Sequence, residues 1–506
     1  MVSRIRTVAF IGMRPIEIIV ESQISPGIAS FCIVGLPDKT VGEAKERIRS
    51  TFYQLGIGFP SKKIIVNMAP ADIPKGGSHY DLPIALSILG AMEVIDIARF
   101  DNTISLGELG LDGSLCYVSG AICAAMLANE SDMALICPKA CEKEAAWSGN
   151  EGIIAVQSLM SLINHFTGVS QIAPTETCVP HFNDTEFDVD MSDVFGQLFA
   201  KRAVEIAASG GHNVLMIGSP GSGKSMLATR MRTILPPLNS FESLETTCIY
   251  SLSGVPPEEG LVYLPPFRDP HHSASLISIV GGGADAKPGE ISLAHNGILF
   301  LDELPEFQRG TIDALRQPLE TNNITISRAK EHVTYPANIQ LIAAMNPCKC
   351  GYYGNPQKQC LKAPRCAADY RNRISGPILD RFDIIIYVQS INIKELFEKE
   401  KCDTSKIIRQ RVTYTREIQI NRANQYNIKD SKLNGKVKGK YLNEITTIDP
   451  ETSRFFQQLV QHTHISSRGC YKVLRVARTI ADMEGSKIIR KEHVAEAVQY
   501  RLLEIK

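Results

Sequence analysis

Apolar and polar positions alternate with two different periods over the first third of the chain. Residues 30–34 and 63–68 are short apolar runs of strand length, whereas residues 40–55 and 82–91 have the spacing of helices. This mixture predicts a domain of strands and helices over residues 1–167. Pro, Thr, Asn and Asp interrupt the pattern at residues 168–193, which predicts a linker.

From residue 194 the pattern changes to apolar strands separated by helical segments. Strand-like runs at residues 213–217, 297–301 and 338–345 predict a parallel α/β core over residues 194–392. Residues 393–440 are highly charged and predict a helical connector that ends in a loop, and residues 441–506 predict an all-helical region. A chain of 506 residues is long enough for each of these domains to have its own core.

The loop after the first core strand has the pattern G-x-x-x-x-G-K-S of a phosphate-binding loop. Its residues are Gly218, Ser219, Pro220, Gly221, Ser222, Gly223, Lys224 and Ser225. The glycines let backbone N–H groups surround a polyphosphate, and the helix that follows directs its positive end toward it. We expect Lys224 to neutralise the β- and γ-phosphates and Ser225 to ligate Mg²⁺. The sequence therefore predicts a site for a nucleoside triphosphate.

Polar side chains end the next two predicted strands. Asp302 and Glu303 follow residues 297–301, and Asn346 follows residues 338–345. Asp302 is expected to hold the Mg²⁺ shell, Glu303 to orient the attacking water, and Asn346 to sense the γ-phosphate. An acidic pair also ends many ordinary parallel strands, and an Asn before a Pro is also typical of a turn. The phosphate loop about eighty residues upstream of the acidic pair favours hydrolysis.

Composition restricts where the chain acts. Lys plus Arg total 54 and Asp plus Glu total 54, so any nucleic-acid surface must be local. The first residues do not resemble a signal peptide, and no apolar run reaches transmembrane length. Thirteen cysteines, an odd number, favour reduced thiols. These features predict a cytoplasmic protein without a membrane partner.

Four of the cysteines fall within nineteen residues directly after Asn346. They are Cys348, Cys350, Cys360 and Cys366, in an insertion over residues 346–370. Tetrahedral zinc binds four thiolates, and a polar loop of this kind has little else to hold it in place. The spacing departs from the usual paired C-x₂-C knuckles, and four unconnected thiols are the alternative. We predict a structural Zn²⁺ site.

Longer motifs resemble the ComM/YifB family of magnesium-chelatase-like AAA+ ATPases. They are the phosphate loop and residues 288–297, 302–307 and 374–383. The likeness extends over nearly the whole chain and implies a P-loop AAA+ α/β core with a C-terminal all-α lid. It further implies ATP and Mg²⁺ as cofactors, a homo-hexameric ring, and single-stranded and branched DNA as partners. The family is associated with branch migration and with integration of DNA during natural transformation.

The resemblance also assigns roles to arginines. Arg381 matches the finger that reaches the γ-phosphate held by a neighbouring subunit, where a planar guanidinium suits spread negative charge. A surface arginine paired with a flanking aspartate is the alternative. Arg468 matches the second sensor arginine, and Arg475 and Arg478 are alternatives for that role.

Two segments resemble the Lon protease domain, residues 74–83 and 107–115. The resemblance implies an N-terminal α+β domain of this type. His79 stands at the position of the nucleophilic serine and Ile122 at that of the lysine base, and an apolar side chain cannot take a proton. Peptidase activity is therefore not expected, although Ser78 and Lys75 form an alternative pair.

Two hairpin-like segments, residues 281–288 and 325–332, are the candidates for DNA contact. Related proteins of the clade direct such hairpins into a central channel, where basic side chains grip phosphates. The residues concerned are Lys287, Arg328 and Lys330. Solvated hairpin tips are the alternative.

Three functional classes follow. The first is an ATP-driven DNA motor, a helicase or branch-migration enzyme. The second is a metal-chelatase-type motor, as in magnesium chelatase. It is disfavoured because the resemblance gives this chain a Lon-like N-terminal domain, which the ATPase subunits of magnesium chelatase are expected to lack. The third is a regulator of proteolysis, which His79 and Ile122 disfavour.

Overall fold

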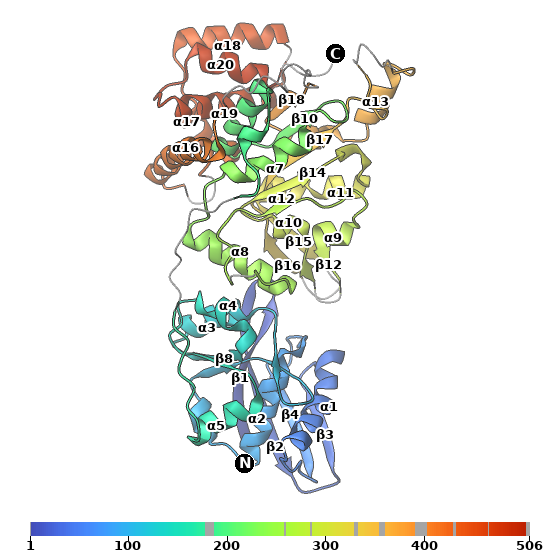
Figure 1. The fold of residues 1–506 in the computed structure, drawn as a ribbon, viewed down its shortest axis with the longest axis vertical. Helices are drawn as coiled ribbons and strands as arrows, with labels where there is room; N and C mark the ends of the chain where they lie inside the picture. Colours follow the sequence, from blue (N-terminus) through green and yellow to red (C-terminus); the bar gives the residue numbers. More distant parts are fainter. Residues whose placement is uncertain are drawn as a thin grey trace.

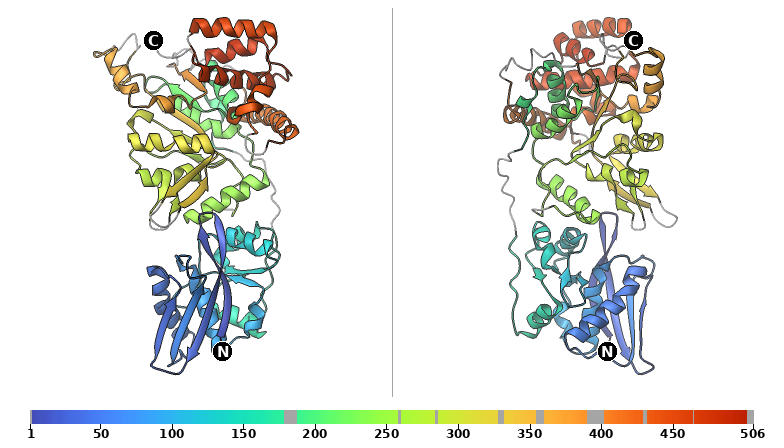
Figure 2. Two further views of the ribbon diagram at one scale, coloured as in Figure 1. Left: turned by 180° about the vertical axis from the view of Figure 1, so that it is seen from behind. Right: turned by 45° about the vertical axis from the view of Figure 1, so that its right-hand side comes forward.

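The computed structural model describes residues 2–177, 187–257, 260–283, 286–327, 332–353, 360–389, 402–428, 432–463 and 465–501. Figure 1 shows two lobes, with the N-terminal domain at one end and the α/β core together with the C-terminal helices at the other. Figure 2 shows residues 168–177 running beside the N-terminal domain toward the core. The mixed α/β architecture with a helical C-terminal region confirms the predicted fold class.

The N-terminal domain is built on a seven-stranded sheet of order β3-β4-β2-β1-β5-β8-β9. Its strands are β1 (Val2–Ile11), β2 (Arg14–Ser25), β3 (Ser30–Val34), β4 (Lys63–Ala69), β5 (Thr103–Ser105), β8 (Ala134–Pro138) and β9 (Ile153–Val156). Its main helices are α1 (Lys39–Gln54), α2 (Asp81–Ala91), α3 (Ala121–Glu130), α4 (Glu142–Ala146) and α5 (Leu159–Thr167). Helix α2 is apolar on all sides and packs in the domain core, as its uniform pattern requires.

The second lobe contains a five-stranded parallel sheet of order β11-β14-β17-β10-β18. The strands are β10 (Val214–Ile217), β11 (Phe267–Arg268), β14 (Ile298–Leu301), β17 (Gln340–Met345) and β18 (Ile384–Tyr387). β10, β14 and β17 are almost entirely buried because helices cover both faces of the sheet. β11 has only two residues, too few to show the alternation of a strand, so the hydrophobic pattern did not predict it. With β11 included, β14 is the third strand of the core in chain order.

Helices and two hairpins surround this sheet. The helices are α6 (Leu198–Gly210), α7 (Lys224–Ile234), α8 (Ser240–Ser253), α9 (Leu276–Val280), α10 (Glu290–Leu293), α11 (Arg309–Ala314), α12 (Arg316–Thr321), α13 (Arg365–Arg371) and α14 (Gly376–Leu379). The hairpins are β12 (Gly281–Gly282) with β13 (Lys287–Pro288), and β15 (Asn323–Ser327) with β16 (His332–Pro336).

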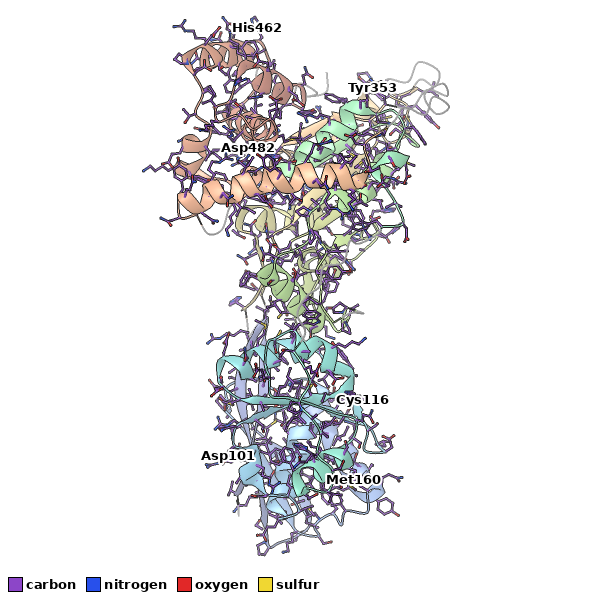
Figure 3. The ribbon with its side chains drawn as sticks, turned by 60° about the vertical axis from the view of Figure 1, so that its left-hand side comes forward. Asp101, Cys116, Met160, Tyr353, His462 and Asp482 are labelled. Carbon is purple, nitrogen blue, oxygen red and sulfur yellow. The ribbon has the colours of Figure 1, made fainter. Side chains whose placement is uncertain are left out.

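The C-terminal region is helical and packs on the core. It comprises α16 (Ser405–Gln425), α17 (Gly439–Ile445), α18 (Pro450–Thr463), α19 (Ser467–Met483) and α20 (Lys491–Gln499). Apolar residues of α16, α19 and α20 share one buried cluster with α6 and the strands. Asp482, labelled in Figure 3, lies beside α16 and forms an ion pair of 2.6 Å with Arg422. Within the residues described above, no helix is both long and apolar enough to span a membrane.

Several contacts join the lobes, among them one at the turn between β1 and β2 and one at helix α8. The turn between β1 and β2 packs against the β15–β16 hairpin so closely that a Cβ on Gly12 would lie 2.8 Å from Val333 Cγ1. In the second contact, the Ser251 hydroxyl of α8 accepts from Gly120 N at 2.8 Å and donates to the buried carboxylate of Glu144. Helix α8 is thereby attached to the N-terminal domain.

Candidate nucleotide-binding site

The carboxyl ends of β10, β14 and β17 meet at one edge of the parallel sheet. Ile217 lies beside Met345, and Leu301 lies beside Ala343, so the residue that follows each strand projects at the same edge. Gly218 N donates to Met345 O at 3.2 Å, which fixes the start of the phosphate loop. Parallel strands therefore bring together three segments that are far apart in sequence.

Lys224 begins α7 and its ammonium lies between the loop and β17. Its Nζ donates to Gly218 O at 2.8 Å, Ser219 O at 3.0 Å and Asn346 Oδ1 at 3.3 Å. Burial lowers the pKa of Lys224, and the carboxylates of Asp302 and Glu303 oppose that shift. The structure thus places Lys224 with the sensor candidate Asn346 and with both predicted acids.

Ser225 and Asp302 are direct partners. Ser225 Oγ donates to Asp302 Oδ2 at 2.7 Å. The two predicted Mg²⁺ ligands are therefore close enough to bind the same ion. Glu303 has a left-handed backbone with φ of 52° and donates its N–H to Asp302 Oδ1 at 2.9 Å. Its side chain is half exposed, which leaves the carboxylate accessible to a water molecule.

Sequence reasoning missed three residues at this edge. Asp269 follows β11, and burial, followed by the charge of Asp302, raises the pKa of its carboxyl. His272 Nδ1 lies 3.8 Å from Glu303 Oε2. Gln197 Nε2 donates to Ser222 O at 2.9 Å and to Gln389 O at 2.8 Å, which links the phosphate loop to the segment after β18. The polar residues directly after the short β11 were the available signal for the first two.

Arg381 lies at the amino ends of the parallel strands, opposite the end that carries the phosphate loop. It precedes β18, whose first residue pairs with the first residue of β10, and its carbonyl accepts from Asn213 Nδ2 at 3.0 Å. Its guanidinium forms an ion pair with Glu320 of α12, not with the flanking aspartates. Burial, then the charges of Arg468 and Arg316, lower the pKa of Arg381.

The three arginines of α19 have different environments. Arg468 is 80% exposed and lies 3.4 Å from Asp380, on the same side of the sheet as Arg381. Arg475 lies 4.0 Å from the buried Asp383. Arg478 is buried and bound to Asp482 and to the carbonyl of Lys487, so it serves the packing of the C-terminal helices. Of the three, Arg468 has by far the most exposed side chain, since Arg475 is 17% and Arg478 only 2% exposed.

A cavity of about 740 Å³ opens beside Arg381 and Arg468. Its charged lining residues are Arg381, Lys436, Lys438, Arg468, Lys472, Arg475, Glu320, Asp380 and Asp383. Six cations against three anions give this face a net positive charge. Such a face suits an anionic ligand.

The four predicted cysteines lie together. The sulfurs of Cys348, Cys350, Cys360 and Cys366 are within 4.8 Å of one another, and those of Cys348 and Cys350 are 3.2 Å apart. Zinc–sulfur bonds of about 2.3 Å in a tetrahedron separate the sulfurs by about 3.8 Å. The residues present therefore fit a zinc ion.

The Lon-like positions form no catalytic pair. His79 is buried, its Nε2 lies 2.9 Å from Val8 O, and burial lowers its pKa to about 4. Ile122 is buried in the cluster that joins α3 to Cys248. The alternative pair is also engaged elsewhere, because the Ser78 hydroxyl donates to Glu108 and the Lys75 ammonium to the Pro70 carbonyl.

The DNA candidates are only partly placed. Lys287 is exposed on β13 and lines a cavity of about 380 Å³ between its hairpin and the N-terminal domain. Arg328 and Lys330 lie outside the described residues. Their hairpin is described from its base, where β15 pairs with β16.

The five-stranded parallel sheet, the phosphate loop and the acidic strand end define a P-loop ATPase. Three family models match: "Magnesium chelatase, subunit ChlI" over residues 190–396, "Subunit ChlI of Mg-chelatase" over 20–141, and "Magnesium chelatase, subunit ChlI C-terminal" over 402–501. The chain belongs to the ComM/YifB family of magnesium-chelatase-like AAA+ ATPases.

Relatives match along nearly the whole chain. The Escherichia coli protein YifB, described as uncharacterized, is 41% identical over 99% of this chain and 97% of its own length. Competence protein ComM of Haemophilus influenzae is 39% identical over 98% and 96%. DNA replication licensing factor mcm6 of Dictyostelium discoideum is 25% identical over 38% of this chain and 19% of its own.

The family match changes one argument from the sequence. The N-terminal domain was expected to separate this chain from magnesium chelatase subunits. Residues 20–141 themselves match a family described by that subunit's name, so the domain does not separate the two classes. The distinction must come from activity.

Proposed function

We propose that this protein is an ATP-driven DNA motor, a homo-hexameric helicase that promotes branch migration during recombination or integration of transforming DNA. The observation that carries the proposal is the position of Arg381, at the sheet edge opposite the phosphate loop of its own chain. ATP hydrolysis then requires a neighbouring subunit, as a ring provides.

The length of the strands supports action between subunits. β10 has four residues, and at about 3.3 Å per residue its amino and carboxyl ends are roughly 13 Å apart. Arg381 cannot cross the buried sheet to its own phosphate loop. The cationic face that contains Arg381 and Arg468 is instead suited to the ATP held by an adjacent copy.

Within one subunit, each residue at the carboxyl edge has a distinct task. Lys224 and the loop N–H groups bind the β- and γ-phosphates, while Ser225 and Asp302 hold Mg²⁺. Bound Mg²⁺–ATP supplies the phosphoryl group and the charge neutralisation. Glu303 orients the attacking water, and Asn346 couples the γ-phosphate position to β17.

DNA as the partner is supported by the names of relatives and by the hairpins. One relative is a competence protein, and a more distant one is a DNA replication licensing factor. Both hairpins leave the sheet on the segments that lead to β14 and β17, whose ends carry the acids and the sensor. We propose that Lys287, Arg328 and Lys330 grip DNA phosphates as nucleotide state changes.

The decisive test is ATPase rate with single-stranded, branched or no DNA. We expect branched DNA to raise turnover, and the triple change of Lys287, Arg328 and Lys330 to Ala to abolish that stimulation while basal turnover stays within about twofold. Lys440→Ala, which alters a 92% exposed lysine of α17, is the matched control. If neither single-stranded nor branched DNA changed the ATPase rate, a chelatase-type motor or a regulator of proteolysis would be favoured instead.

We also propose a structural zinc at the four cysteines. Elemental analysis should find about one zinc per chain, because four thiolates complete a closed tetrahedral site. Cys366→Ser is expected to lose most of the metal, while Cys470→Ser, on α19, keeps it. Equal zinc content in both variants would exclude this ligand set.

A further inference from the structure

The cysteine loop touches the phosphate loop on both sides of its first two cysteines. Before them, Asn346 Oδ1 accepts from Lys224 Nζ at 3.3 Å. After them, Gly351 packs on Pro220, and a Cβ on Gly351 would lie 2.6 Å from Pro220 Cδ and 2.7 Å from Cγ. Gly351 is buried although Pro220 is exposed, so the Gly351 backbone lies beneath the proline ring. The loop therefore follows the outer wall of the phosphate site.

The segment that carries the first two cysteines is a short turn. Residues 346–353 contain no helix or strand, and the bonds within the turn include Gly351 N to Cys348 O at 2.9 Å and Tyr353 N to Cys348 Sγ at 3.3 Å. Figure 3 labels Tyr353 at the far end of the molecule from the N-terminal domain. A turn outside regular secondary structure is held more firmly when it is cross-linked to an anchored element.

The other two cysteines come from a well-anchored element. Cys366 lies in α13, and Cys360 precedes that helix. Tyr370 of α13 is 3% exposed and belongs to the cluster under the sheet. The cysteine cluster thus joins two segments, one fixed to the core and the other in contact with the phosphate loop.

We propose that zinc at the four cysteines is a brace for the phosphate loop, so that nucleotide affinity depends on the metal. By linking α13 to the turn at residues 348–351, the metal holds Gly351 against Pro220. The phosphate loop then keeps the conformation in which its backbone N–H groups point toward the bound phosphates. This inference rests on the zinc site proposed above and adds a function to it.

The first experiment removes the metal from the intact protein. A zinc-selective chelator is applied in excess Mg²⁺, zinc is measured, and the Kd of a fluorescent non-hydrolysable ATP analogue is determined. We expect about tenfold weaker binding, as for lost support around a site, and recovery with zinc but not with added Mg²⁺. The unfolding temperature is recorded in parallel, and a fully folded metal-free protein with weak binding supports the brace.

The outcomes separate the two proposals. Protein that neither contains nor takes up zinc would refute the zinc site and the brace together. Zinc that can be removed without any change in nucleotide affinity would refute the brace alone. Loss of affinity that follows global unfolding, seen as a collapse of the unfolding transition, would also count against a local brace.

A variant tests the route of the coupling. Pro220→Ala keeps every fixed position of the phosphate loop but removes the ring that covers Gly351. We expect weaker analogue binding that no longer responds to zinc removal, because the two changes break the same contact. Pro237→Ala, at another exposed proline of the core, should keep full affinity and full zinc dependence. Undiminished zinc dependence in Pro220→Ala would overturn the proposed route.

Discussion

Arg381→Ala is expected to lower ATP turnover of the assembled protein by about 10³-fold or more while leaving ATP binding nearly unchanged. In the proposed mechanism the guanidinium stabilises charge on the phosphoryl oxygens of a neighbouring subunit's ATP in the transition state. It lies at the end of the sheet opposite its own phosphate loop, so it is not expected to contribute to binding there. Turnover by coupled phosphate release and binding of a fluorescent analogue measure the two effects separately.

Arg309→Ala is the matched control. Arg309 is 82% exposed and pairs across one helical turn with Asp313 at 4.0 Å, so its loss should leave turnover within about twofold. The proposed site between subunits is tested by mixing two variant proteins. A mixture of Arg381→Ala protein and Glu303→Gln protein should recover part of the activity, since some interfaces then hold one intact Arg381 and one intact Glu303. Mixed rings that form without any recovery would contradict action between subunits.

Glu303→Gln is expected to lower turnover by about 10²- to 10⁴-fold with ATP binding retained. An amide keeps the shape of the side chain but cannot polarise water as a carboxylate does. Because bound ATP persists, this variant should accumulate assembled rings, which light scattering detects at fixed ATP.

Glu306→Gln provides the comparison three residues further on. Glu306 pairs with Arg373 at 3.0 Å and has no proposed role at the phosphate site. We expect it to turn over ATP within about twofold of the unchanged protein. If Glu303→Gln matched Glu306→Gln in turnover, the water-orienting role would belong to another group, and Asp269 or His272 would be tested next.

Some parts of the site could be predicted from the sequence because residues that are adjacent in the chain form them. The phosphate loop needs glycines, a lysine and a serine at fixed spacing, and its flanking strand and helix are also local patterns. Asp302, Glu303 and Asn346 were predictable for the same reason, since each directly follows an apolar run. The structure places them together at one edge of the sheet.

The tertiary structure decided everything that depends on where distant segments meet. The parallel pairing of β18 with β10 put Arg381, which precedes β18, at the end of the sheet opposite the phosphate loop. Packing buried Arg478 while leaving Arg468 exposed. The contact of Gly351 with Pro220 joins residues about 130 positions apart. Local spacing fixes the conformation of a loop or strand, whereas side-chain packing across the sheet fixes which loops touch. The sequence alone therefore predicted the chemistry of the phosphate site, and the fold determined which residues contact its loop and which basic side chains, such as that of Arg468, stay exposed.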